Sequence, residues 1–254
     1  MKGIIPNNEP FFLPAGSTGC LLLHGFSSMP EETRPLGEYL AGRGFSVLGA
    51  RLAGHGTHPN DLRQTRWTDW LDDVANGLAI LSKICKRNVL IGQSLGGMIA
   101  LTAAARMDVS GVVALSTPYG TAPGESLANW LLRLLHPTIR KNVNRFPPDH
   151  PLYHRRELNY PAYPEFPSRI LTELDRLGTA MLKALPQVRA PVLLIHSRDD
   201  HDVPFQCMQS IYDHVGSQRK EMLAMEGMDH SLLMDPRRQV VFEAVDRFLK
   251  EIEE

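Results

Sequence analysis

Residues 89–100 read Val89-Leu90-Ile91-Gly92-Gln93-Ser94-Leu95-Gly96-Gly97-Met98-Ile99-Ala100. The first three residues are apolar and predict a short buried strand, whereas the residues from Leu95 onward predict a helix. Between them lies Gly-x-Ser-x-Gly, which is typical of the strained strand-to-helix turn called a nucleophile elbow. Gly92 and Gly96 suit such a turn, because glycine has no side chain and tolerates unusual backbone angles. The stretch therefore predicts an exposed Ser94 hydroxyl at a helix N-terminus, which stabilises developing negative charge.

A glycine-rich turn before a helix could instead bind a phosphate group. A dinucleotide-binding turn requires Gly-x-Gly-x-x-Gly, and Ser94 stands where the second glycine would be. A P-loop requires Lys followed by Ser or Thr, and no such pair follows Gly97. The sequence thus favours a serine nucleophile over a phosphate site.

The overall composition argues against several classes of protein. With 27 basic and 28 acidic residues, the chain has no net field to attract nucleic acid or a membrane surface. No run reaches the roughly 20 apolar residues of a membrane span, and the N-terminus lacks a signal-peptide pattern. Cys20, Cys85 and Cys207 are far apart in the sequence, which favours reduced thiols over a disulfide framework. We expect a cytoplasmic protein with no nucleic-acid partner and no stable membrane association; the oligomeric state is not indicated.

Strands and helices alternate along most of the chain. Apolar runs that predict strands lie at residues 9–15, 20–23, 45–48, 89–91, 111–115, 192–195 and 221–225. Helical patterns lie at residues 33–43, from an N-cap at Thr68, at 170–185, at 204–215 and from a cap at Asp235-Pro236. This alternation predicts an α/β fold, a mostly parallel sheet with helices on both faces.

The sequence changes character between Pro118 and Pro186. This segment contains ten of the nineteen prolines, no alternating strand pattern, and short helical patterns such as that at residues 127–135. Because regular alternation resumes after it, we predict an inserted lid at 118–186 and a core made of 1–117 and 187–254. Its stretch 159–169 contains three prolines and two tyrosines, which favours a stiff rim over a swinging flap.

A serine hydroxyl is a weak nucleophile, so it needs a base, and the base needs an orienting acid. In an α/β-hydrolase these follow in the order Ser, Asp, His, on loops at the carboxyl ends of strands. The two loops after the later strands read Ser197-Arg198-Asp199-Asp200-His201-Asp202 and Glu226-Gly227-Met228-Asp229-His230. His230 is therefore the predicted general base, and three aspartates of the first loop compete as the acid.

The sequence resembles the carboxylesterases and compact bacterial monoacylglycerol lipases of the α/β-hydrolase fold. The motifs that carry the resemblance are His24-Gly25-Phe26, Gly54-His55-Gly56, Gly92-Gln93-Ser94-Leu95-Gly96-Gly97, Asp200-x-x-Val203-Pro204 and Gly227-x-x-His230. They extend over essentially the whole chain, and residues 118–186 are the least similar part. The resemblance selects Asp200 as the acid, four residues before the proline, and leaves Asp199 and Asp202 as loop charges. The implied triad is Ser94, Asp200 and His230.

The tetrahedral intermediate of such a reaction needs two backbone N–H donors. One is expected from Leu95, directly after the nucleophile, and the family resemblance assigns the other to Phe26. The Phe26 ring either lines the acyl pocket or packs in the core. His55 and His58 have a spacing that a metal could use, but no third ligand is near in sequence, so a structural loop is favoured.

These features predict a serine hydrolase that cleaves small carboxylic esters of short to medium acyl chains without a metal or organic cofactor. Because the triad does not encode the leaving group, a lactone, thioester or C–C bond hydrolase is the alternative. A non-catalytic small-molecule binder is a second alternative, since a fold alone does not establish a reaction.

Overall fold

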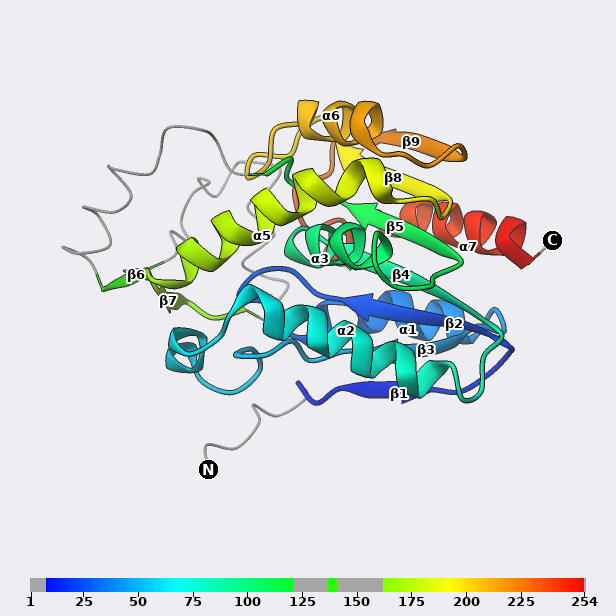
Figure 1. Cartoon of the computed structure of the whole chain (residues 1–254). Helices are drawn as coiled ribbons and strands as arrows, with labels where there is room; N and C mark the ends of the chain where they lie inside the picture. Colours follow the sequence, from blue (N-terminus) through cyan, green and yellow to red (C-terminus); the bar gives the residue numbers. More distant parts are fainter. Residues whose placement is uncertain (1–7, 121–136, 141–161, 254) are drawn as a thin grey trace.

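The computed structural model describes residues 8–120, 137–140 and 162–253, and its centre is a seven-stranded sheet (Figure 1). The strand order is β1-β3-β2-β4-β5-β8-β9. These strands are β1 (Phe11–Leu13), β2 (Thr18–Leu23), β3 (Ser46–Gly49), β4 (Arg87–Gln93), β5 (Gly111–Leu115), β8 (Val192–Ser197) and β9 (Lys220–Met225). Only β1 pairs antiparallel among them, at one edge. The predicted mostly parallel sheet is confirmed.

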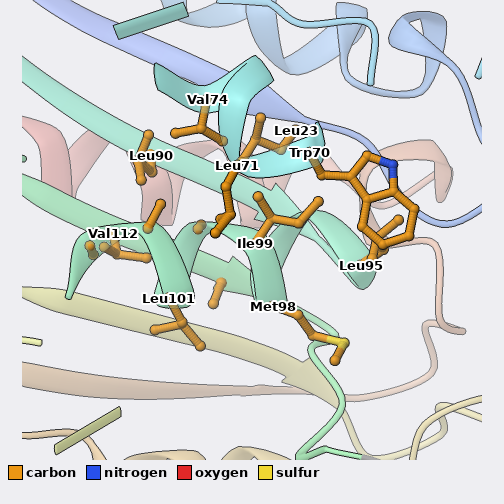
Figure 2. Packing of buried hydrophobic residues seen from close by; sticks show 14 of the residues in the cluster. Leu23, Trp70, Leu71, Val74, Leu90, Leu95, Met98, Ile99, Leu101 and Val112 are labelled. Carbon is orange, nitrogen blue, oxygen red and sulfur yellow. The ribbon is translucent and has the colours of Figure 1, made fainter. Parts of the chain in front are cut away.

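Helices cover both faces of this sheet, as predicted (Figure 1). One face carries α1 (Arg34–Ala41) and α7 (Gln239–Glu253), and the other carries α2 (Trp67–Leu81), α3 (Leu95–Ala104), α5 (Ile170–Ala184) and α6 (Gln206–His214). Short 3-10 helices are η1 (Pro30–Glu32), η2 (Pro59–Arg63), η4 (Leu185–Gln187) and η5 (Leu232–Met234). Figure 2 shows α2 and α3 packing Trp70, Val74 and Ile99 over the strand residues Leu90 and Val112.

The central strand β4 is buried on both faces, which explains its continuous apolar run. It pairs with β2 on one side and with β5 on the other. Leu23 at the end of β2 is the register partner of Gly92, and Gln93 is the partner of Leu115 at the end of β5. The carboxyl ends of three neighbouring strands therefore meet beside Ser94.

Two predicted helix starts are wrong, and in each case an aspartate sets the true start. Helix α2 begins at Trp67 with Arg66 as its N-cap, rather than after Thr68, because the Asp69 carboxylate accepts a 2.8 Å bond from the Arg66 N–H. Helix α7 begins only at Gln239, because Asp235 holds a preceding turn by accepting a 2.8 Å bond from the Arg237 N–H.

A second, two-stranded sheet lies where the sequence indicated no strand. Strand β6 (Thr138–Arg140) pairs antiparallel with β7 (Glu165–Pro167). Each strand has three residues, which is too short for the two-residue alternation of a strand to be visible in the sequence.

The inserted lid at 118–186 stays a prediction, and its expected helix at 127–135 lies outside the described residues. At the far end of this segment, α5 packs Ile170, Leu177 and Met181 into the same core cluster as α2 and α3. Helix α5 therefore belongs by its packing to the helix layer over the sheet.

The three cysteines, Cys20, Cys85 and Cys207, are all free, as predicted. Burial raises the pKa of the Cys20 thiol, which keeps it in the neutral form. Within the described residues, no helix combines the length and apolar character that crossing a membrane requires.

Candidate active site

Ser94 stands between β4 and α3 in a backbone conformation that few non-glycine residues adopt, with φ 55° and ψ −111°. Two glycines make this turn possible, because each lies too close to a neighbouring backbone group to have a side chain. A Cβ on Gly92 would overlap the Gly96 carbonyl, and a Cβ on Gly96 would overlap the Leu23 carbonyl. The Ser94 N–H also donates a 2.7 Å bond to Leu115 O, which ties the turn to β5. The neighbouring glycines thus allow, and the sheet holds, a strained serine of the kind that clusters at functional sites.

The structure brings Ser94, His230 and Asp200 together in one hydrogen-bonded chain. His230 Nε2 lies 2.9 Å from Ser94 Oγ, and His230 Nδ1 lies 2.8 Å from Asp200 Oδ2. The Asp200 side chain is fully buried, whereas the His230 side chain retains 13% exposure. In this geometry the imidazole can accept the serine proton at Nε2 while Nδ1–H stays bonded to the carboxylate.

The buried Asp200 carboxylate is stabilised by four donors. Oδ1 accepts bonds from the N–H groups of Asp202 at 2.9 Å and Val203 at 2.8 Å, and Oδ2 faces both His230 and His196. Burial by itself raises the pKa of Asp200, but the bonds to the two histidines outweigh it and hold this pKa below its usual range. Asp200 is therefore ionised at neutral pH.

His196 is the residue at this site that sequence reasoning missed. It lies on β8, is 1% exposed, and places Nε2 3.0 Å from Asp200 Oδ2. The only sequence signal is a polar residue that follows the apolar run at residues 192–195. That signal does not show which side chain the histidine meets.

Further bonds join the loop after β8 to the loop after β9. Ser197 Oγ donates to Met228 O at 2.5 Å, and the Gly227 N–H donates to Asp199 Oδ2 at 2.5 Å. Asp199 is an exposed charge on the loop, and its carboxylate also connects the two loops. Gln93 also donates from Nε2 to His230 O at 2.7 Å, which fixes the backbone of the base beside the elbow.

The loop after β2, which contains Phe26, is held by buried side chains. Glu32 Oε2 accepts from the Gly25 N–H at 2.6 Å, and His55 Nε2 accepts from the Ser27 N–H at 3.1 Å. Ser27 has a positive φ of 57°, so the chain turns sharply directly after Phe26. The structure thus holds this turn next to the elbow; the two oxyanion donors, Phe26 and Leu95, remain a prediction.

The ring of Phe26 packs between two other aromatic rings. Its centroid is 4.9 Å from that of Phe166 and 6.2 Å from that of His55, both edge to face. The segment before β7 also contacts this turn, since the Tyr163 N–H donates to Ser27 O at 2.8 Å and Ala162 forms a β-bridge with Ser28. The packing interpretation of the Phe26 ring is confirmed, and its role in an acyl pocket stays a prediction.

The structural interpretation of His55 is also confirmed. His55 is fully buried and uses both ring nitrogens, since Nδ1 lies 3.0 Å from Ala53 O while Nε2 accepts from Ser27. His58 accepts the Asn60 N–H at 3.1 Å and caps η2. In the described part of the chain, no three His, Cys, Asp or Glu side chains are grouped as metal ligands.

His24 makes the stability of the protein depend on pH. It is fully buried, with Nδ1 donating to Gly25 O at 2.9 Å and Nε2 accepting from the Leu52 N–H at 3.3 Å. Burial lowers the pKa of His24 from 6.5 to about 4. Between those two values the unfolded chain binds a proton that the folded chain does not, so stability falls as pH falls from 6.5 to about 4. We expect this one group to remove about 3 kcal/mol of unfolding free energy by pH 4.

Urea unfolding of the wild type and of His24→Gln between pH 7.5 and 4 measures this contribution. The wild type should lose stability more steeply than the variant, and the difference between the two curves isolates His24 from other groups. The exposed His214, changed to Gln, is the matched control and should keep the wild-type slope. Parallel curves for the wild type and His24→Gln would show that His24 is not held neutral.

Comparison with known proteins finds a hydrolase family and relatives named as a lipase and an esterase. The model of a hydrolase family described as serine aminopeptidase S33 matches residues 17–237. A thermostable monoacylglycerol lipase of Bacillus sp. (strain H-257) is 30% identical over 94% of this chain and 93% of its own length. A carboxylesterase of Bacillus subtilis (strain 168) is 26% identical over the full length of both chains.

Solved structures agree on the fold. A chain from work on two metagenome-derived lipolytic enzymes, LipS and LipT, superposes with a TM-score of 0.89 at 26% identity, covering 98% of this chain and all of that one. A monoacylglycerol lipase of Paleococcus ferrophilus gives a TM-score of 0.79 at 19% identity, over 96% and 98% of the two chains. At that lower identity the second likeness shows the fold alone.

Proposed function

The chain belongs to the α/β-hydrolase family described as serine aminopeptidase S33, among serine hydrolases that include esterases and lipases, and we propose that it cleaves small carboxylic esters. We propose acyl chains of short to medium length and an activity of the carboxylesterase or monoacylglycerol lipase type. The observation that carries the proposal is His230, whose two ring nitrogens lie 2.9 Å from Ser94 Oγ and 2.8 Å from Asp200 Oδ2.

In the proposed reaction Ser94 Oγ attacks the ester carbonyl while His230 Nε2 removes its proton. His230 then returns this proton to the leaving alcohol, which leaves an acyl-enzyme on the serine. Water, deprotonated by the same imidazole, then attacks the acyl carbonyl. The bond from the acyl carbon to Ser94 Oγ breaks, Oγ takes the proton back from His230, and the acid leaves. Throughout the cycle, the ionised Asp200 stabilises the imidazolium that forms twice.

Two backbone N–H groups are proposed to bind the oxyanion, those of Leu95 and Phe26. Leu95 is the first residue of α3, and the N–H groups of a first helical turn have no acceptor within the helix. Phe26 follows β2, whose last residue, Leu23, is the register partner of Gly92. Each such donor lowers the barrier by about 3 kcal/mol in other hydrolases.

The preference for short to medium chains is supported by the fixed segment at residues 162–167. Ala162 and Tyr163 are bonded to the turn that contains Phe26, and Phe166 packs on the Phe26 ring. Tyr163 Oη also accepts from the Thr57 N–H at 2.9 Å, so this rim is anchored on a second loop. A rim bonded at several points suits a pocket of limited length, and long-chain triglyceride would not fit.

We expect the rate of hydrolysis to be highest on soluble esters and monoacylglycerols with short or medium acyl chains. The measurement is kcat/KM for p-nitrophenyl esters and monoacylglycerols of increasing acyl length, with emulsified triolein as the long-chain test and Ser94→Ala as the control. A best rate on triolein, or strong activation at the oil–water interface, would contradict the pocket that we propose.

The same panel separates the alternatives. A thioester, a lactone and a C–C bond substrate test other leaving groups on the same triad, and an aminoacyl p-nitroanilide tests the peptidase activity in the family's description. Turnover of one of these without ester hydrolysis would replace the proposed substrate class. Absence of any turnover, with tight binding of a small molecule, would favour a non-catalytic binder.

A further inference from the structure

We propose that His196 is a positioning residue, whose hydrogen bond holds the Asp200 carboxylate in place and which shares one carboxylate oxygen with His230. The inference deepens the proposed function and rests on it, because it takes Asp200 and His230 as the partners of the nucleophile. It adds a fourth side chain to the hydrogen-bonded chain that begins at Ser94.

The tautomer of His196 follows from its two neighbours. Nε2 lies 3.0 Å from Asp200 Oδ2 and 3.1 Å from Val203 O, and both of these atoms are acceptors. A ring nitrogen placed between two acceptors must carry a hydrogen. His196 Nε2–H is therefore a donor that faces both the carboxylate and the turn following it.

His196 and the backbone N–H groups bind different oxygens of the Asp200 carboxylate. Asp200 Oδ1 is fixed by the N–H groups of Asp202 and Val203, whereas Oδ2 is held by the two histidines. Since the Asp200 side chain is fully buried, solvent does not stabilise Oδ2 in place of a lost donor. Without His196, the donor that remains on Oδ2 among the described residues is His230 itself, so this oxygen loses one of its two bonds while Oδ1 stays held by the backbone.

Sharing of Oδ2 also affects the base. Asp200 Oδ2 lies 2.8 Å from His230 Nδ1. The N–H of His196 places the positive end of a dipole at the same oxygen, which weakens the interaction between Asp200 and the His230 ring. Loss of His196 is therefore expected to change the pH profile of the reaction as well as its rate.

The ionisable groups around this pair have contacts of their own. The Asp199 carboxylate is bonded to Gly227, and His201 Nδ1 lies 3.6 Å from Asp229 Oδ1, while Asp202 is exposed. From the side of α6, Phe205 packs edge to face on His196, and the Arg198 guanidinium lies 4.6 Å over the Phe205 ring. Burial raises the pKa of the Cys207 thiol, and the nearby charge of Asp200 raises it further.

The test compares three variants. His196→Met removes the donor at similar volume, and His196→Gln keeps an amide N–H. His201→Gln changes a histidine in the loop that contains Asp200, where the structure pairs His201 with Asp229. The readouts are kcat and KM between pH 5 and 9, and titration of the His230 ring followed by NMR. Circular dichroism and thermal unfolding establish that each variant is folded.

For His196→Met we expect the acid limb of the rate profile, and the NMR titration of His230, to move to higher pH by about half a unit to one unit. The plateau kcat should fall about tenfold at nearly unchanged KM, as expected when an orienting bond is lost. His196→Gln should recover more than half of both effects, and His201→Gln should match the wild type.

An unmoved His230 titration in His196→Met, or a shift to lower pH, would overturn the proposal, as would equal losses in the Met and Gln variants without a shift. If His196→Met does not fold, His196→Asn takes its place against His196→Gln, because the shorter Asn side chain holds its amide N–H farther from Asp200 Oδ2. Failure of the proposed function is a separate outcome, because the NMR titration needs no substrate. Wild type that cleaves no ester would refute the function, and the ring titrations would still decide the role of His196.

Discussion

Ser94→Ala is expected to reduce ester hydrolysis by a factor on the order of 10⁶ in kcat, as loss of the nucleophile does in another serine hydrolase. Without Oγ no acyl-enzyme forms, and the remaining groups bind substrate without offering a path to products. The measurement is turnover of a p-nitrophenyl ester by the purified variant, together with labelling by a fluorophosphonate, which should react with Ser94 of the wild type and not with the variant.

Removing one oxygen should not harm the fold. The strained backbone of Ser94 is held by its N–H bond to Leu115 O and by the space at Gly92 and Gly96, and alanine keeps all of these. Thermal unfolding should therefore resemble that of the wild type. The matched control lies on the helix that follows: Thr102→Ala removes a buried hydroxyl that donates to Met98 O of the helix backbone, and it should keep full activity. Undiminished hydrolysis by Ser94→Ala would refute the nucleophile assignment.

Asp200→Asn is expected to lower kcat by about 10⁴, the loss measured when the acid of a related triad is changed in this way. An amide that donates toward His230 Nδ1 favours the wrong tautomer, so Nε2 carries a hydrogen and is unable to accept the serine proton. The same change also removes the charge that stabilises the imidazolium. KM should change much less than kcat, because the Asp200 side chain is fully buried and offers no surface to a substrate.

The matched control is Asp202→Asn, on the same loop and exposed, which we expect to stay within about twofold of the wild type because surface charges contribute little. Asp199→Asn should fall between the two, since the Asp199 carboxylate accepts the Gly227 N–H and an amide oxygen can replace it in part. If Asp199 or Asp202 proved the most sensitive position, the assignment of Asp200 as the acid would be wrong.

The elbow could be predicted from the sequence because its causes are local. The close approaches at Gly92 and Gly96 involve a turn of a few residues and the next strand, and only glycine fits there. The apolar runs that predict the buried strands are likewise visible within a few consecutive residues. The mostly parallel sheet and its cover of helices on both faces then follow from the alternation of strands and helices.

The missed features depend on contacts between segments that are distant in sequence. The bond from Gly227 to Asp199 joins two separate loops, and the pairing of β6 with β7 joins strands on either side of residues 141–164. His196 is close to Asp200 in sequence, but their side chains meet only because the loop after β8 folds back on itself, with the Val203 N–H bonded to Asp200 Oδ1. No periodicity or motif in the sequence indicates these contacts, so they are visible only in the folded structure.

The adjacency of β5 and β8 has a consequence for how such a protein can change over evolutionary time. These two strands pair side by side although residues 116–191 lie between them in the sequence. The entropic cost of closing a flexible loop grows only with the logarithm of its length, about 0.6 kcal/mol per doubling. Insertions between these strands are therefore inexpensive where they leave α5 in place, since Ser94, Asp200 and His230 lie on other loops of the sheet. The length of the interval can thus change without moving these three side chains.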